Sequence, residues 1–131
     1  MGSNRVVALL GRILVAVPFL VFGEMKIAQF HFYAGLLAAM KVPKPTIALV
    51  IVIIIEVLGG ICLAVGFKAR LWAWLMFLYL IPVTFTAHNF WTYTGAARLD
   101  NEIHFMKNVA ILGGLLLIAA FGPGSLSADK T

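Results

Sequence analysis

Long apolar runs separated by short polar segments dominate the chain. Four runs approach the roughly twenty residues that an α-helix needs to cross the hydrocarbon core of a bilayer. They cover residues 6–23, 46–67, 71–90 and 103–121. No segment outside them is long enough to build a second core. The pattern predicts an all-α integral membrane protein, a four-helix bundle that forms a single domain over residues 1–131.

The segments between the runs constrain how the helices connect. Only Lys68, Ala69 and Arg70 join the second run to the third, so these two helices should form an antiparallel hairpin. Residues 28–42 are apolar but too short to cross the membrane, and they predict an interfacial or re-entrant helix. The fourth run should end at Gly122-Pro123-Gly124, because that sequence cannot continue a helix.

The composition makes lipid the solvent of this chain. Hydrophobic residues make up 63% and charged residues 11%, whereas a soluble domain carries roughly a quarter charged residues. The net charge of +5 comes from Lys and Arg scattered at the ends of the apolar runs, as membrane anchors are, so no nucleic-acid partner is expected. The single cysteine, Cys62, cannot form an internal disulfide and is interpreted as a packing residue.

The first run predicts a membrane helix and not a cleaved signal peptide. It contains Arg12, and no small-x-small cleavage site precedes a polar mature region. An even number of helices places both termini on one side, and the tight basic loop at Lys68 and Arg70 favours the cytoplasmic side.

Two charges fall deep within the apolar runs. A charge near the bilayer centre costs about 2.5–3.5 kcal/mol on insertion scales, so each needs a partner or a wet cavity. At a rise of about 1.5 Å per residue, Arg12 and Glu56 both fall near the midplane. Small residues share their helix faces, as packing faces in membranes require, so both should point inward. We expect a central Arg12–Glu56 ion pair.

A second polar layer is expected on the side opposite the termini. There Lys107 should face Glu24 and His88, with Thr84 one turn from His88 and Asn108 beside Lys107. No His-x-x-x-His or Glu-x-x-His pair occurs, so no metal site is predicted. The candidate ligand-binding pocket consists of Arg12, Glu24, Glu56, Thr84, His88, Lys107 and Asn108.

A structural interpretation of the same residues stays open. The Arg12–Glu56 pair would then fix the helix register without taking part in any reaction, and Lys107 would extend its ammonium group to the interface. No catalytic residue is assigned from the sequence.

Taken together, these residues resemble the DoxX family over nearly the whole chain. The resemblance rests on Arg12, on Glu56 followed by Gly59-Gly60 and Gly66, on His88, on Lys107-Asn108 with Gly113-Gly114, and on the tail from Gly122 to Asp129. It implies a four-helix protein of a bacterial or archaeal cytoplasmic (inner) membrane. It also implies a link to quinones, because the family takes its name from a small subunit of thiosulfate:quinone oxidoreductase.

Three functions remain as hypotheses. In the first, the chain is a redox-complex-associated subunit that binds quinone; Arg12 or Lys107 donates to a carbonyl oxygen, and His88 or Glu24 handles protons. The chain has no haem-ligand pair, flavin fingerprint or iron–sulfur cysteines, so no covalently bound cofactor is expected and a partner oxidoreductase would carry the redox centre. The second is a non-catalytic anchor or scaffold for such a partner, and the third is a small-solute transporter. A homo-oligomer stays open as well.

Overall fold

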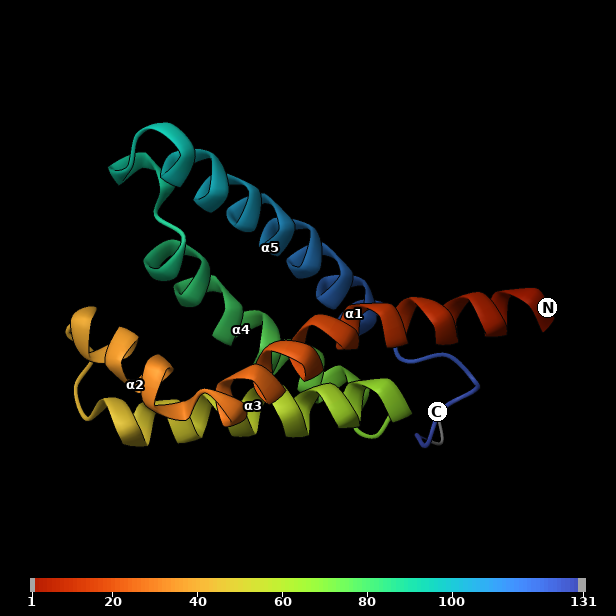
Figure 1. Cartoon of the computed structure of the whole chain (residues 1–131). Helices are drawn as coiled ribbons and strands as arrows, with labels where there is room; N and C mark the ends of the chain where they lie inside the picture. Colours follow the sequence, from red (N-terminus) through yellow and green to blue (C-terminus); the bar gives the residue numbers. More distant parts are fainter. Residues whose placement is uncertain (1, 130–131) are drawn as a thin grey trace. The chain divides into compact units, whose positions relative to one another are not determined.

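The chain folds into helices joined by short connections. The computed structural model describes residues 2–129, with side chains from residue 4 onward. Four described helices are long and apolar enough to cross a membrane, which confirms the predicted fold class. The elements, drawn in Figure 1, are α1 (Gly2–Ala28), α2 (Phe30–Ala39), α3 (Pro45–Val65), α4 (Ala69–Ala87), the 3-10 turn η1 (Phe90–Thr92) and α5 (Gly95–Phe121).

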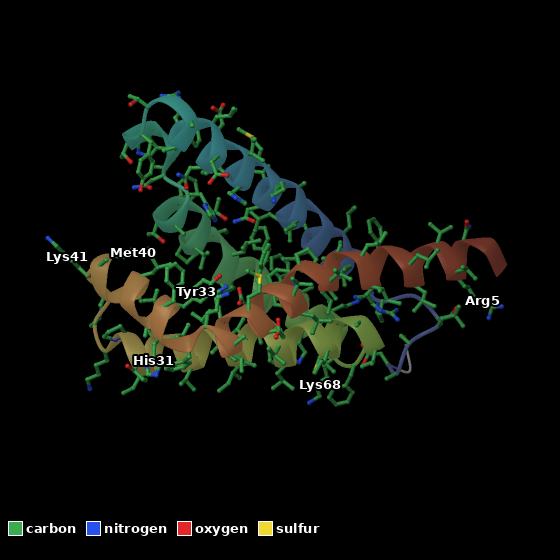
Figure 2. All side chains as sticks on the ribbon, viewed as in Figure 1. Arg5, His31, Tyr33, Met40, Lys41 and Lys68 are labelled. Atoms are coloured by element: carbon green, nitrogen blue, oxygen red, sulfur yellow. The ribbon has the colours of Figure 1, made fainter. Side chains whose placement is uncertain are left out.

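The ends of the helices differ from the ends of the apolar runs. α5 begins at Gly95, well before the predicted start at residue 103, so Arg98 and Asp100 lie on this helix. The reason is that an apolar run marks the lipid-facing part of a helix, while polar turns continue the same helix beyond it. The predicted short helix after the first run is confirmed as α2, which has no buried residue. Figure 2 shows Lys41 beyond its end, pointing away from the helix.

The helices group into two compact units, which are described separately below. Unit 1 comprises Met1–Lys68 and Pro123–Thr131, and unit 2 comprises Ala69–Gly122. Unit 1 therefore holds α1, α2, α3 and the tail that follows α5, whereas unit 2 is the α4–α5 hairpin with η1. The prediction of one domain stays a prediction.

In unit 1, glycines let α1 and α3 pack closely, side by side in Figure 1. A Cβ atom on Gly60 would lie 2.7 Å from Cδ2 of Leu20, and one on Gly23 would lie 2.7 Å from Cγ2 of Val57. Because Leu20 meets Gly60 while the later residue Gly23 meets the earlier Val57, the two helices run antiparallel. Small residues at such contacts are typical of membrane helices, where close approach supplies the packing energy.

The carboxyl end of α3 is closed first by a local turn. Gly66 has a φ of +76°, the Phe67 amide donates to the Cys62 carbonyl at 2.8 Å, and the Gly66 amide donates to the Leu63 carbonyl at 3.2 Å. This is a Schellman motif, which requires a residue in the left-handed region and so favours glycine. The helix therefore ends at Val65, two residues before the end of the apolar run.

The tail after α5 completes this helix end. The amides of Ala128 and Asp129 donate to the carbonyls of Val65 and Gly66, both at 2.9 Å. In return, the Asp129 carboxylate accepts from the Lys68 amide at 2.6 Å. The last carbonyls of a helix have no partner within it, and here the tail supplies donors to them.

In unit 2, α4 and α5 form a hairpin through η1. The buried residues of α4 recur every three or four positions and so lie on one face of the helix. They are Ala69, Ala73, Met76, Leu80 and Thr84. α5 ends at Phe121, where the Gly-Pro-Gly sequence predicts its end, and Gly122 then adopts a φ of +83°.

Replacing Gly66 by Ala should lower the stability of the protein. A left-handed conformation costs an L-residue about 1–2 kcal/mol, and the new Cβ would collide with the Cβ of Ser127 in the tail. We expect a loss on the order of 2 kcal/mol or more, measured by thermal unfolding in detergent micelles. Gly113→Ala is the control, because a Cβ there meets nothing within 4 Å and alanine favours the helix. A Gly66→Ala protein as stable as the control would contradict the docked tail.

Candidate functional site

The residues predicted for the pocket fall into both units. Arg12, Glu24 and Glu56 belong to unit 1, and Thr84, His88, Lys107 and Asn108 belong to unit 2. Glu24 is exposed on α1 and Lys107 is exposed on α5. The predicted contact between Lys107 and Glu24 would join the two units, and it stays a prediction.

Arg12 is buried, with 2% of its surface exposed, and it binds backbone carbonyl groups. Its Nε and Nη2 atoms donate to the Ala64 carbonyl at 3.2 and 3.1 Å, and Nη2 also donates to the Leu126 carbonyl at 2.9 Å. Nη1 donates to the Pro123 carbonyl. Since the carboxyl end of a helix carries partial negative charge, a cation at the last turn of α3 is favourable. Arg12 thus ties α1 to the end of α3 and to the tail.

The predicted Arg12–Glu56 ion pair is wrong. Glu56 instead forms an ion pair with Lys26, with 3.0 Å between Nζ and Oε1. The carbonyl of Ala64 that binds Arg12 lies about two turns beyond Glu56 on α3, or roughly 12 Å along the axis. The prediction placed both charges by the midpoints of their apolar runs. α1 and α3 differ in length, so Arg12 is level with the end of α3 and not with its centre.

The Lys26–Glu56 pair is held by three helices. The Nζ of Lys26 on α1 lies 5.8 Å from the ring centroid of Phe22, one turn earlier, and 5.2 Å from that of Tyr33, which projects from α2 (Figure 2). The two charged side chains are 19% and 8% exposed. Aromatic faces attract a cation, so the rings and the carboxylate together balance the cost of burying this ammonium. The Phe22–Lys26 spacing was the sequence signal for this site.

Two histidines stack within unit 2. The rings of His88, just beyond the end of α4, and His104 on α5 lie 5.0 Å apart between centroids at an angle of 25°. Nδ1 of His88 lies 3.3 Å from Oδ1 of Asn101, and Nε2 of His104 lies 3.5 Å from Oδ1 of Asp100. We call His88, Asp100, Asn101 and His104 the histidine cluster. Asn101 was missed by the sequence analysis, although it precedes His104 by three positions and so shares its helix face.

A second polar contact lies about one turn from this cluster. Nδ2 of Asn108 donates to Oγ1 of Thr84 at 3.1 Å, and that hydroxyl donates to the Leu80 carbonyl at 2.7 Å. Residues three or four positions apart lie on the same face of a helix. On α5 this spacing relates Asn101, His104 and Asn108. At the end of α4 it relates Thr84 and His88. We call the five residues Thr84, His88, Asn101, His104 and Asn108 the polar stripe. Polar groups within an apolar hairpin mark a functional-site hypothesis.

Aromatic rings gather next to the polar stripe. The Phe105 ring lies 5.3 Å from the Phe85 and Phe90 rings and 6.0 Å from the Trp91 ring, all between centroids and all with edge-to-face geometry. The guanidinium of Arg98 lies over the Phe90 ring at 5.5 Å. Because Phe105 directly follows His104, the rings and the stripe lie at the same end of the hairpin. Such a site can bind a flat molecule that has apolar faces and polar edges.

The described residues show no cluster of three or more His, Cys, Asp or Glu side chains that could hold a metal ion. Three neighbouring groups lie close enough to His88 to act on it electrostatically: His104, Asp100 and Lys107. The stripe therefore offers hydrogen bonds and charge to a ligand, supplied by imidazole, amide, hydroxyl and ammonium groups.

Comparison with known proteins identifies relatives along most of the chain. The family model described as DoxX matches residues 7–89. The inner membrane protein YphA of Escherichia coli (strain K12) is 36% identical over 98% of this chain and 92% of that protein. The inner membrane protein YqjF of the same organism is 34% identical over 93% of this chain and 88% of that protein. The ER-derived vesicles protein ERV29 of Saccharomyces cerevisiae is 33% identical over 60% of this chain but 25% of that protein. No solved structure matches the chain.

Double-mutant cycles should separate the two ion-pair arrangements. Lys26→Met combined with Glu56→Gln should show a coupling energy of about 1–3 kcal/mol in the free energy of unfolding, because these side chains touch. Arg12→Met combined with the same Glu56→Gln should be additive within about 0.5 kcal/mol, because Arg12 binds backbone carbonyls elsewhere on α3. Equal coupling in the two cycles would contradict the observed pairing.

Proposed function

The chain belongs to the DoxX family, and we propose that it is an inner-membrane subunit that binds a quinone headgroup at the polar stripe of its α4–α5 hairpin. The stacked His88 and His104 beside Asn101 are the observation that carries this proposal. A quinone ring has apolar faces and oxygen atoms at opposite edges, so it needs aromatic surface together with hydrogen-bonding groups. The stripe and the rings around Phe105 supply both.

Polar groups around the stripe have distinct roles in this proposal. The amide of Asn108 uses one N–H for Thr84, and its second N–H is available to a ligand oxygen. The ammonium of Lys107 is a second donor, close enough to act on His88. The imidazole of His88 lies on the stripe beside these donors and faces the oxygen at the opposite edge of the headgroup. These groups come from α4, its end and α5, so the hairpin alone can present them.

Arg12 has no part in the proposed site. A guanidinium has five N–H donors. That of Arg12 already makes four hydrogen bonds, to the carbonyls of Ala64, Pro123 and Leu126. Glu56 forms an ion pair with Lys26 and also has no part in the proposed site. The proposed pocket is therefore smaller than the one expected from the sequence, and it lies within unit 2.

Redox chemistry at such a site requires a partner. The sequence contains one cysteine and neither a flavin fingerprint nor a pair of haem ligands, so a partner oxidoreductase subunit would exchange electrons with the bound quinone. A scaffold without ligand binding is the competing function. The engagement of Arg12 by backbone carbonyls favours it for unit 1, because that residue acts there as a structural clamp.

Quinone binding should depend on the polar stripe. We expect saturable binding of a short-chain benzoquinone to the full chain in lipid nanodiscs, read out by quenching of tryptophan fluorescence, since Trp91 lies beside Phe105. His88→Phe and Asn108→Leu should each weaken binding of the hydroquinone form of this probe about tenfold, which corresponds to about 1.4 kcal/mol for a lost hydrogen bond.

The control variant is His31→Phe, which changes an exposed histidine of α2 in the same way. Its quenching curve should match that of the unchanged protein, and the comparison removes the contribution of quinone dissolved in lipid. The scaffold function would be favoured if no saturable binding occurs, or if all three variants bind equally.

A further inference from the structure

We infer that the histidine cluster selects the reduced, hydroxyl-bearing hydroquinone over the oxidised quinone. The inference rests on the proposed function and adds to it which form of the ligand the site prefers. Its basis is that the contacts of His88 fix Nε2 of this ring as a hydrogen-bond acceptor.

The first step is the orientation of Asn101. Its Nδ2 donates to the Ala97 carbonyl, one turn earlier on α5, at 3.0 Å. An amide nitrogen placed there leaves Oδ1 facing Nδ1 of His88, at 3.3 Å. A carbonyl oxygen can only accept a hydrogen bond, so Nδ1 of His88 must carry the hydrogen. The tautomer of His88 thus follows from the hydrogen-bond network around Asn101.

The second step is the charge on the stacked pair. Two imidazolium rings 5.0 Å apart would repel each other, so the stack favours at most one positive charge. The carboxylate of Asp100 contacts His104, with 3.5 Å between its Oδ1 and Nε2 of that ring. Lys107 adds further positive charge near His88. Because Asp100 contacts His104 and the positive charge of Lys107 lies near His88, we take His88 as the neutral ring of the pair.

The third step is the consequence for a ligand. A neutral imidazole with its hydrogen on Nδ1 has a lone pair on Nε2. In the part of the chain that the structure describes, the hydrogen bond of the His88 ring is made by Nδ1, and His104 stacks on its face, so the edge with Nε2 is left for a ligand. A hydroxyl donates to that lone pair. A quinone carbonyl can only accept, and it would place two acceptors against each other.

Discrimination of this kind is large in proteins. A site that accepts or donates a hydrogen bond to a ligand hydroxyl rejects an analogue that lacks it, because the protein group is left unpaired. The donors Lys107 and Asn108 do not discriminate, since the oxygen atoms of both forms accept hydrogen bonds. Preference therefore depends on His88, and Asn101 is a positioning residue that acts through it.

The test compares the two forms of one probe. Dissociation constants for a short-chain benzoquinone and its hydroquinone are measured without oxygen, on the full chain in lipid nanodiscs. We expect the hydroquinone to bind at least tenfold more tightly. Acidification that protonates His88 puts a hydrogen on Nε2, and because a donor does not discriminate between the two forms, the preference should then be lost. His104, Asp100 and Lys107 are the neighbouring titratable groups that act on His88.

Two variants test the role of the tautomer. Asn101→Leu removes the acceptor that holds the hydrogen on Nδ1, so the preference should fall to about threefold or less. His88→Gln presents an amide that both donates and accepts, so it should bind both forms with similar affinity; it serves as the second probe if Asn101→Leu does not fold. Asn89→Leu is the control, because it removes a neighbouring amide side chain outside the cluster.

The outcomes distinguish the two proposals. If neither form binds saturably, the proposed function fails, and the inference fails with it. If both forms bind to the unchanged protein with equal affinity, or the oxidised form binds more tightly, the inference is overturned while the proposed function stands. A preference that survives in both Asn101→Leu and His88→Gln would also overturn the inference, because it would then come from other groups.

Discussion

The guanidinium of Arg12 binding backbone carbonyls is the interaction on which unit 1 depends. It connects the early part of α1, the last turn of α3 and the tail, segments that lie far apart in the sequence. Each carbonyl that it binds lies at a helix end or in an irregular segment, where helical hydrogen bonds do not supply a partner, and an unpaired buried carbonyl is costly. The arginine is equally dependent on them, since a buried charge needs nearly all of its donors occupied. One side chain thereby makes an irregular tail compatible with a membrane protein.

Lys26 and Glu56 are also charges with little exposure that need a partner, but each finds it in the charged side chain of the other. Their charges neutralise each other at 3.0 Å, and Tyr33 of α2 adds an aromatic face to the cation. This contact gives the short helix α2 a defined place, although none of its residues is buried. The charged residues of unit 1 therefore organise its helices, while the polar residues of unit 2 line up along one stripe of the hairpin.

The hydrophobic pattern was sufficient to predict the spans, because each helix must present about twenty apolar residues to lipid. It could not predict the axial offset between α1 and α3, which depends on helix lengths and on the glycine contacts. For that reason Arg12 and Glu56 were correctly identified as buried charges but given the wrong partners. In unit 2, the stripe residues Thr84, His88 and Asn108 were selected by residue type. Asn101 was missed because it lies between the third and fourth apolar runs, outside the helices that those runs predict, although it belongs to α5.

The docking of the tail on α3 has a consequence for biosynthesis. Residues 123–129 leave the ribosome after all the helices that the structure describes, yet they bind to Arg12 and to the end of α3 in unit 1. During synthesis, α1 and α3 can enter the membrane and pack through their glycines, but the carbonyls of Ala64 and Val65 must find temporary partners. The α4–α5 hairpin needs no later segment and can form first. Unit 1, although its helices are translated earlier, therefore becomes complete only after α5 has been made.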